Sequence, residues 1–380
     1  MNNRAGKYIS NLKGEMEYFS FLPTPLPPEP KIIYDNELID CMISATSNIS
    51  VLNNVAKLLD NFDMYLALYV QKEALLSSQI EGTQATIEDV FSPQADRNKS
   101  RDIEDIVNYI KAYKYATKKL QKLPLCNRLL CETHEVLLSN TRGNDKNPGE
   151  FRRSQNWIGP DNCTIKDAKF IPPNVENMNK CMSDLEKFIN CETETNYLIN
   201  ASLIHYQFET IHPFLDGNGR IGRLLTILYL IDKKVLDSPS LYISYYLKVN
   251  KIEYFDRINE VRRTGNYEQW TKFFLRAIAK SAEDAVQTIY LFNNLHISNN
   301  EKVQKSHGSS KNLQFVFEYI EHHPITDIKS AAKDLGLSYN TVACCVQKLV
   351  DCNILVKTNK AKRNRTYEYK DLLDLLRPGT

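Results

Sequence analysis

Twelve residues in the second half of the chain, His212 to Arg223, bring together a histidine, an aspartate, two arginines and a Gly-Asn-Gly turn. Hydrophobic segments with helical spacing flank this loop, Tyr197–Thr210 before it and Ile221–Leu236 after it. The pattern predicts two buried helices whose connection gathers polar groups at the start of the second helix. Because unpaired N–H groups and the helix dipole favour anions at a helix N-terminus, the loop predicts a phosphate site.

Each polar residue type in this loop suits the handling of a nucleotide. The turn Gly217–Gly219 permits backbone conformations with positive φ and close approach of a ligand. Arg220 and Arg223 share roughly one helix face, and guanidinium groups match phosphate oxygens. Asp216 is a hard oxygen ligand suited to Mg²⁺, and His212 can take up a proton near neutral pH.

The stretch resembles the signature of the Fic family, H-x-F-x-[DE]-G-N-G-R-x-x-R, at every defined position. The resemblance implies a protein adenylyltransferase that moves AMP from ATP to a Ser, Thr or Tyr hydroxyl of target proteins and of itself. It implies His212 as the catalytic general base and Asp216 as the Mg²⁺ ligand. It implies ATP phosphate binding by Gly217, Asn218, Gly219, Arg220, Ile221, Gly222 and Arg223. The intact Gly219 favours AMP transfer over phosphorylation, while UMP or another nucleotide donor stays open.

A predicted helix upstream, Met64–Ile80, runs into Glu81-Gly82. Ser77, Glu81 and Gly82 resemble the inhibitory motif of the same family, [ST]-x-x-x-E-[GN]. A carboxylate at the end of a helix faces the negative end of the dipole and is better placed beside a cation. The resemblance implies that this cation is Arg223. It also implies autoinhibition, because pairing with Glu81 would divert Arg223 from the γ-phosphate of ATP. A second role stays open, in which Glu81 positions a water that removes AMP from modified targets.

Two short extended pieces follow in the middle of the chain, Trp157–Asn162 and Ala168–Ile171, the second ending at Pro172-Pro173. They resemble the Fic flap, a β-hairpin over the active site, and a plain structural hairpin is the alternative. The resemblance implies that the target protein docks near residues 155–172 by strand addition. A looser resemblance assigns a nucleoside pocket to Ile158, Gly159, Tyr254, Phe255 and Arg262.

The predicted fold class is mainly α: a Fic helical core with a β-hairpin flap, plus a small winged helix-turn-helix domain. The predicted parts are a regulatory region with the inhibitory helix at 1–100, the core at 101–291, a linker at 292–312 and the winged domain at 313–380. The linker is predicted because its segment contains Asn, Ser, Lys and Gly and shows no hydrophobic periodicity. The proline-rich stretch Phe21–Pro30 predicts extended chain.

The C-terminal part predicts helices at Leu313–Ile320, Asp327–Leu335 and Tyr339–Val350, then two extended pieces around the basic turn Lys360–Arg365. This order resembles a winged helix-turn-helix. From Lys311 to Lys370 there are eight lysines and two arginines against six acidic residues, which is consistent with DNA contacts. A protein-interaction or dimerisation module is equally open. An ATP-sensing DNA-binding regulator is therefore the second function class, and a toxin-like effector is a third, disfavoured by the Glu81 segment.

Composition restricts the class of protein but not the function. Hydrophobic content of 42%, charged content of 25% and a formal net charge of +2 are ordinary for a soluble globular chain. No apolar run approaches the ~20 residues of a membrane span, so we expect no membrane partner. Nine cysteines without a C-x-x-C pair, and a polar N-terminus without a signal-peptide core, predict a reduced, cytoplasmic protein. A homodimer stays open. His134 and His205 are expected to be packed rather than catalytic.

Overall fold

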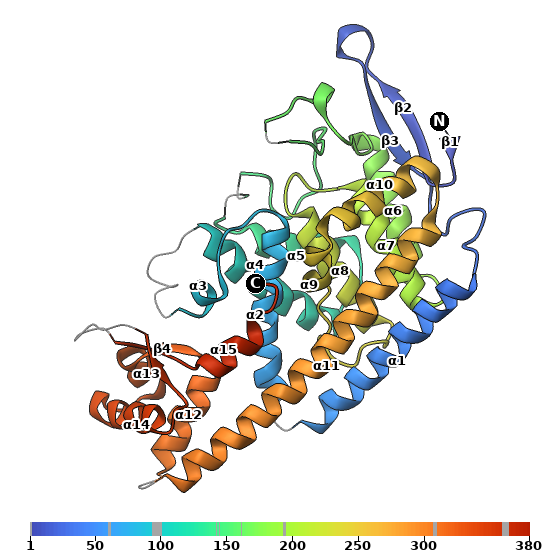
Figure 1. Ribbon diagram of the computed structural model, residues 1–380. Helices are drawn as coiled ribbons and strands as arrows, with labels where there is room; N and C mark the ends of the chain where they lie inside the picture. The colour runs from blue at the N-terminus through green and yellow to red at the C-terminus, as the bar shows by residue number, and fades with distance from the viewer. Residues whose placement is uncertain are drawn as a thin grey trace. The chain divides into compact units, whose positions relative to one another are not determined.

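The computed structural model describes residues 2–59, 62–92, 101–141, 143, 145–160, 162–192, 195–306, 310–358 and 365–380 (Figure 1). Its contacts divide the chain into two units. Unit 1 consists of Met1–Asn53 and Val107–Glu283, and unit 2 of Asn54–Ile106 and Asp284–Thr380. This division differs from the predicted one, because residues 54–106 group with the C-terminal part of the chain. Among the described residues, no helix has the length and apolar character needed to cross a bilayer.

Unit 1 is built around two helices, α7 (Tyr197–Ile211) and α8 (Asn218–Asp232). Every side chain of α7 from Leu198 to Ile211 is buried, as expected of a helix that is packed on all sides. α8 packs along α7, so the two helices predicted around the loop are confirmed. The other helices of this unit, wholly or in part, are α1 (Asn36–Leu58), α4 (Arg101–Leu120), α5 (Asn127–Leu138), α6 (Val175–Asn190), α9 (Ser244–Val249), α10 (Lys251–Thr264) and α11 (Tyr267–Lys305).

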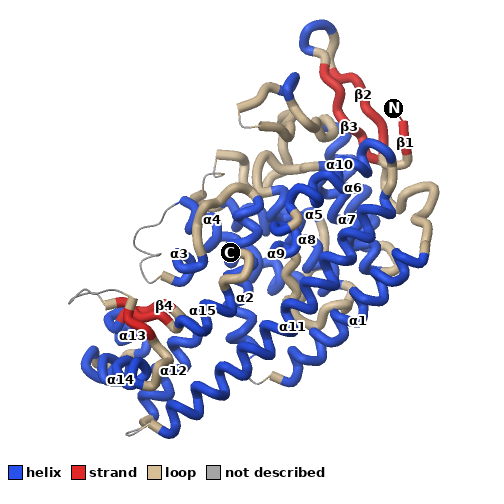
Figure 2. Tube along the Cα trace, in the orientation of Figure 1, coloured by secondary structure: helices blue, strands red, loops and turns tan. Residues whose placement is uncertain are grey.

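The N-terminus forms a small antiparallel sheet, drawn in red in Figure 2, which the sequence did not predict. Its strands are β1 (Asn2–Asn3), β2 (Gly6–Asn11) and β3 (Tyr18–Pro23), in the order β1-β2-β3. Gly6 pairs with Pro23 and Asn11 with Tyr18. The predicted extended chain from Phe21 is thus partly a sheet strand. The hairpin escaped prediction because neither strand alternates strictly between apolar and polar residues.

The predicted flap is present as a minimal hairpin. Ile158 and Phe170 form one antiparallel bridge, with the Ile158 N–H donating to the Phe170 carbonyl at 2.8 Å and the Phe170 N–H returning to Ile158 at 3.1 Å. The Phe21 N–H of β3 donates to the carbonyl of Ile171 at 2.9 Å. The second flap segment therefore lies between its hairpin partner and the N-terminal sheet. Asp161, inside the predicted turn, lies outside the described residues.

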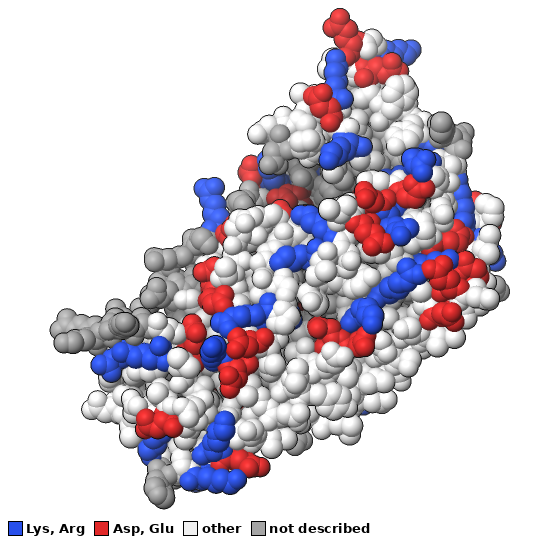
Figure 3. Space-filling view, in the orientation of Figure 1, with Lys and Arg blue, Asp and Glu red and all other residues white. Residues whose placement is uncertain are grey.

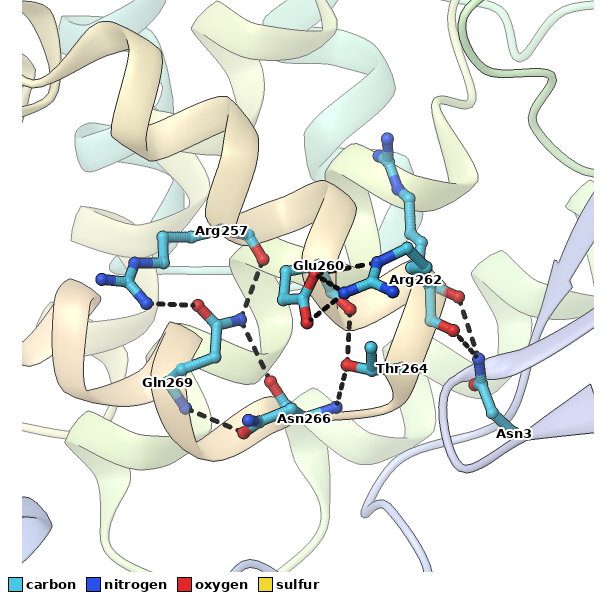
Figure 4. A network of polar contacts seen from close by, with 8 residues as sticks. Asn3, Arg257, Glu260, Arg262, Thr264, Asn266 and Gln269 are labelled. Carbon is cyan, nitrogen blue, oxygen red and sulfur yellow. Dashed lines mark hydrogen bonds and ion pairs between the residues drawn. The ribbon is translucent and has the colours of Figure 1, made fainter.

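A sharp corner joins α10 to α11, and Figure 4 shows the polar contacts that hold it. Gly265 ends α10 with φ +78°, a left-handed conformation that favours glycine. The Thr264 hydroxyl donates to the Glu260 carbonyl at 2.8 Å and accepts the Asn266 N–H at 3.2 Å. The Asn3 side chain donates to the Arg262 carbonyl at 3.0 Å, which attaches the N-terminal strand to the same corner.

Unit 2 combines the helix before Glu81 with the C-terminal domain. Its N-terminal elements are α2 (Phe62–Ile80) and α3 (Ile87–Phe91). Its C-terminal elements are α12 (Lys311–His322), β4 (Ile325–Asp327), α13 (Ile328–Leu335), α14 (Tyr339–Asp351), β5 (Val356–Lys357), β6 (Thr366–Glu368) and α15 (Lys370–Leu376). The strands form one antiparallel sheet in the order β4-β6-β5. The interpretation of this part of the chain as a winged helix-turn-helix stays a prediction. Ser338 caps α14, accepting the Thr341 N–H at 3.1 Å.

The interpretation of residues 292–312 as a linker is wrong for most of that segment, because α11 continues to Lys305. Phe292, Asn299 and Val303 are buried at spacings of seven and four residues, which is one face of a helix. The polar residues between them occupy the other faces, so the segment showed too few apolar positions to predict a helix. Residues 307–309 of this segment lie outside the described residues.

Candidate functional site

The loop between α7 and α8 begins and ends in left-handed backbone. His212 directly follows α7 with φ +51° and ψ +60°, and its N–H donates to the Phe208 carbonyl at 2.9 Å. Gly217 precedes α8 with φ +77°. A left-handed conformation is uncommon for a residue with a β-carbon and persists only where the surroundings hold it. The loop is therefore sharply bent and brings His212 to the start of α8.

Asn218 closes this loop through its side chain. It accepts the Phe214 N–H at 2.9 Å and donates to the Phe214 carbonyl at 2.8 Å, and it is buried. These reciprocal bonds satisfy both backbone groups of Phe214 inside the core. Asn218, predicted as a phosphate-binding residue, therefore shapes the loop with its side chain.

The ring of His212 is oriented by α7. Its Nδ1 lies 3.3 Å from the carbonyl oxygen of Glu209, which can only accept. Nδ1 is therefore assigned as the protonated nitrogen, and this tautomer leaves Nε2 as a proton acceptor. The arrangement suits a general base.

Asp216 and Arg220 form the charged part of the loop. The Asp216 Oδ1 atom accepts the Gly217 N–H at 2.5 Å and lies 3.5 Å from Nη2 of Arg220. The Asp216 side chain is 44% exposed, whereas Arg220 is buried. An accessible carboxylate beside a helix N-terminus fits a Mg²⁺ ion that takes its other ligands from phosphates and water. No cluster of three or more His, Cys, Asp or Glu that could hold a metal occurs in the described ranges.

The first turns of α8 lie against α7 and carry the second arginine. Arg223 is 1% exposed and Ile221 is buried, with the Ile221 N–H donating to the Gly217 carbonyl at 3.0 Å. An ideal β-carbon on Gly222 would lie 2.3 Å from Oε1 of Glu209 and 3.2 Å from Cδ1 of Phe208, so side chains of α7 lie close to α8 at this glycine. The assignment of Ile221 and Gly222 to phosphate binding stays a prediction.

His205 supports α8 from α7, as expected of a packed histidine. Its Nδ1 lies 3.0 Å from the Gly222 carbonyl, and its Nε2 lies 2.8 Å from the Tyr254 hydroxyl. Burial, with the nearby charge of Arg223 as a smaller contribution, lowers the pKa of His205 to about 3. The ring is therefore neutral and links α7, α8 and α10 inside the core.

His134 of α5 supports the loop from the opposite side. Its ring stacks on Phe214 with centroids 3.8 Å apart and an interplanar angle of 9°. Its Nδ1 accepts the Gly149 N–H at 3.0 Å, and its Nε2 lies 3.0 Å from the Asp216 carbonyl, to which it donates. Burial lowers the pKa of His134 to about 4. The sequence predicted a packed histidine here but not its contact with the loop.

The residues assigned to a nucleoside pocket differ in their exposure. Tyr254 is 1% exposed and bonded to His205, whereas its neighbour Phe255 is 42% exposed. The buried Arg262 donates to Thr210 Oγ1 and to the Glu209 carbonyl, each at 3.2 Å, and its guanidinium lies 3.6 Å from the Phe170 ring centroid. Tyr254 and Arg262 are thus held by contacts inside the core, and their assignment to a nucleoside pocket stays a prediction. Ile158 and Gly159 lie in the flap as expected.

Ser77, Glu81 and Gly82 lie at the end of α2 in unit 2, whereas the His212–Arg223 loop belongs to unit 1. Ser77 is buried, the Glu81 N–H donates to the Ser78 carbonyl at 3.0 Å, and Gly82 has φ +103°. A glycine with positive φ directly after the end of a helix is typical of a C-terminal cap. The pairing of Glu81 with Arg223 stays a prediction.

Two residues near the loop were not singled out from the sequence. Arg152 and Asn156, at the start of the flap, both donate hydrogen bonds to loop carbonyls. They lie about sixty residues before the loop, and no short motif includes both groups.

Comparison with known proteins supports the assignment of the loop. A family model described as the Fic/DOC family matches residues 124–230, and one described as the Fic/DOC family N-terminal region matches residues 39–118. Protein adenylyltransferase Fic of Drosophila melanogaster is 35% identical over 117 residues, which are 30% of this chain and 22% of that protein. The chain thus matches about a fifth of the length of such curated relatives.

Solved structures are similar in fold. A Fic family protein from Desulfovibrio desulfuricans G20 has a TM-score of 0.57 at 18% identity, covering 89% of this chain and 97% of that one. A Fic domain containing signaling protein from Bacteroides thetaiotaomicron VPI-5482 has a TM-score of 0.50 at 18% identity, covering 67% and 97%. At these identities the likeness concerns the fold alone.

Proposed function

Because the chain belongs to the Fic/DOC family, we propose that it is a protein adenylyltransferase that transfers AMP from ATP to a hydroxyl of a target protein. The observation that carries the proposal is the position of His212. It follows α7 in left-handed backbone, and its Nδ1 faces the Glu209 carbonyl. It lies one short loop before the N-terminus of α8, where phosphate binding is favoured.

In the proposed reaction, Nε2 of His212 takes the proton from a Ser, Thr or Tyr hydroxyl of the target. The hydroxyl oxygen attacks the α-phosphorus of ATP, and the bond from that phosphorus to the oxygen bridging to the β-phosphate breaks. Pyrophosphate leaves, and AMP stays on the target as a phosphodiester. The rate gain comes mainly from positioning and from stabilising charge on the phosphates.

Phosphate binding is assigned to the N-terminal turn of α8 and its two arginines. Arg220 and Arg223 are both buried, where their charges act in low dielectric. We assign the α- and β-phosphates to Arg220 and the Gly217–Gly219 turn, and the γ-phosphate to Arg223. Asp216 would hold Mg²⁺, which when bound neutralises phosphate charge.

The target is assigned to the free edge of the flap by strand addition. The flap segment at Phe170 and Ile171 already has backbone partners on both sides, Ile158 and Phe21. This leaves the edge at Trp157 and Gly159, both of which are exposed, for the target backbone. The acceptor hydroxyl would then lie over the loop.

Inhibition by Glu81 is proposed as the resting state, with Glu81 competing for Arg223. The test is transfer of label from α-³²P-ATP to protein by the wild type, Glu81→Gly and His212→Ala. We expect much stronger labelling by Glu81→Gly than by the wild type. We expect none by His212→Ala added to the Glu81→Gly background. Equal labelling by wild type and Glu81→Gly would contradict the inhibition, and retained labelling without His212 would contradict its role as base.

A DNA-binding role for the winged domain is a second candidate. Tyr339, Asn340 and Gln347 are exposed on α14, the position of the recognition helix, and Lys357 and Arg365 are exposed at the wing. The rest of the predicted basic turn, Lys360 to Asn364, lies outside the described residues. Specific, salt-sensitive DNA binding by a protein that transfers no label would favour this role.

A further inference from the structure

The flap and the catalytic loop are joined by one buried arginine. Arg152 is 1% exposed, and its Nε donates to the His212 carbonyl at 3.1 Å. Its Nη1 donates to the Ser154 carbonyl at 3.3 Å, and its Nη2 donates to the Pro173 carbonyl. Ser154 and Pro173 lie on the two sides of the flap. A single guanidinium therefore holds the catalytic residue and both ends of the flap.

The backbone of Arg152 and the side chain of Asn156 complete this attachment. The Arg152 N–H donates to the Pro213 carbonyl at 2.8 Å. Asn156 Nδ2 donates to the His212 carbonyl at 3.2 Å and to the Phe214 carbonyl at 3.0 Å. Three consecutive loop carbonyls, including that of His212, thus accept hydrogen bonds from the start of the flap. Together, these hydrogen bonds hold the His212 backbone in its left-handed conformation.

The burial of the charged Arg152 side chain is energetically unfavourable for a purely structural role. The acceptors that the structure describes for the Arg152 side chain are neutral carbonyls, and burial lowers its pKa to about 10. A buried charge without a carboxylate partner costs stability relative to apolar packing. Its five donors in a fixed fork do, however, fix several carbonyls in one geometry, which an ammonium group cannot do.

We propose that Arg152 is a positioning residue of the transfer reaction, which fixes the His212 ring relative to the flap on which the acceptor segment lies. The inference rests on the proposed function. Proton transfer needs the base within hydrogen-bond reach of the hydroxyl, and a shift of about 1 Å in a reacting group can cost about 100-fold in rate. Arg152 bonds carbonyls on the flap side of the loop, so it acts on the acceptor step and not on ATP binding.

The experiment uses the full chain carrying Glu81→Gly as the parent. Arg152→Lys keeps the charge but loses the fork, and Asn156→Ala removes the second pair of loop bonds without touching the buried charge. We expect both to slow single-turnover AMP transfer, by roughly 10- to 100-fold for Arg152→Lys, with the Kd for ATP within about twofold of the parent. Arg4→Lys is the matched control, because Arg4 is also largely buried and ties the N-terminus to Glu268 at 2.9 Å. It should transfer AMP at the parent's rate.

The possible outcomes distinguish a failure of the positioning role of Arg152 from a failure of the proposed adenylyltransferase activity. Transfer by Arg152→Lys and Asn156→Ala at the parent's rate would overturn the positioning role. A weaker Kd for ATP that accounts for the whole loss would overturn it too, by placing Arg152 in nucleotide binding. If Arg152→Lys does not fold, the AMP transfer rate of Asn156→Ala tests the positioning role by itself. No transfer by the parent would instead overturn the proposed adenylyltransferase itself.

Discussion

His134 shows how a residue outside the motif can hold it in place. Its ring covers Phe214, and its two nitrogens bond the backbone on both sides, at Gly149 and Asp216. Both bonds need the neutral imidazole, because Nδ1 must accept while Nε2 donates. Protonation would therefore break the Gly149 bond and place a charge in the core.

This arrangement predicts a loss of stability in mild acid. The pKa of His134 is about 4 in the folded chain against 6.5 when unfolded, so below pH 6.5 only the unfolded state binds the proton. The stabilisation is complete above pH 6.5 and is lost as the pH falls towards 4. Between pH 7 and pH 4.5 this site should cost about 2–3 kcal/mol in the free energy of unfolding, measurable by urea denaturation.

His134→Gln is the control for this loss. The amide can accept from Gly149 and donate to Asp216 but does not titrate. The variant should lose less stability than the wild type over the same pH range. A residual loss is expected from His205, whose pKa is also lowered, to about 3. An unchanged pH dependence in the variant would exclude His134 as the titrating group.

At the residue scale, the sequence identified candidate residues for the chemistry but not the residues that hold them in place. His212, Asp216, Arg220 and Arg223 could be assigned because their residue types and spacing follow from what a nucleotide needs. Arg152 could not, because its role depends on a fold that brings together residues sixty positions apart. The burial of Tyr254 and Arg262 could not be predicted either, because buried aromatic and cationic residues give the same local pattern as the lining of a pocket.

The turn between α7 and α8 depends on the backbone of Gly217. Its φ of +77° is strained for alanine, while an added β-carbon would lie at ordinary distances of 3.4–3.5 Å from Leu137 and His134. Gly217→Ala should therefore act through the backbone, at about 1–2 kcal/mol, by pushing the residue out of the left-handed region. We expect this shift to move Asp216 and the start of α8 and to lower AMP transfer by about tenfold or more.

Gly336→Ala gives a matched control for backbone strain. Gly336 ends α13 with φ +64°, and an added β-carbon would meet nothing within 4 Å. The two substitutions impose similar strain, but only Gly217 adjoins the candidate site. Transfer rates in the Glu81→Gly background, with thermal melting as the stability measure, should fall for Gly217→Ala alone. Equal loss in both variants would mean that general destabilisation explains the effect.

At the element scale, long helices with one apolar face were predicted well and marginal elements were not. α2 and α14 begin and end within a few residues of expectation. The end of α11 was missed because Phe292, Asn299 and Val303 bury one narrow face of an otherwise polar segment. The N-terminal sheet was missed because it takes its stability from partners distant in sequence, among them Ile171 and Arg262.

Charge at the molecular scale gives no indication of a single partner. On the face drawn in Figure 3, lysine and arginine side chains are interspersed with aspartate and glutamate. The formal net charge of +2 agrees with this mixture. The proposed recognition of ATP would therefore depend on the local arginines of α8 rather than on the overall charge of the protein.

Within unit 2, the winged domain is attached directly to the segment that carries Glu81. α12 packs against α2, and Arg377 of the C-terminus donates to Glu88 of α3 at 2.8 Å. The C-terminal half of α11 joins the same domain, with His296 bonded to Glu321 at 2.7 Å and Asn299 to the Tyr369 hydroxyl at 2.6 Å. The predicted C-terminal domain thus belongs to the same compact unit as α2, the helix that precedes Glu81.

A chain that ends at Ser310 should therefore lose more than a winged domain. Asn299, Val303 and the α2 surface under α12 would become exposed, so we expect early proteolytic cleavage in α11 beyond Asp284. If α2 holds Glu81 in its inhibitory position, loosening α2 should also raise labelling from α-³²P-ATP above that of the full-length wild type. Arg377→Ala is the control, because an ion pair between partly exposed side chains is worth about 0–1 kcal/mol. A truncated chain as protease-resistant and as weakly labelled as the full chain would show that α2 is held without the winged domain.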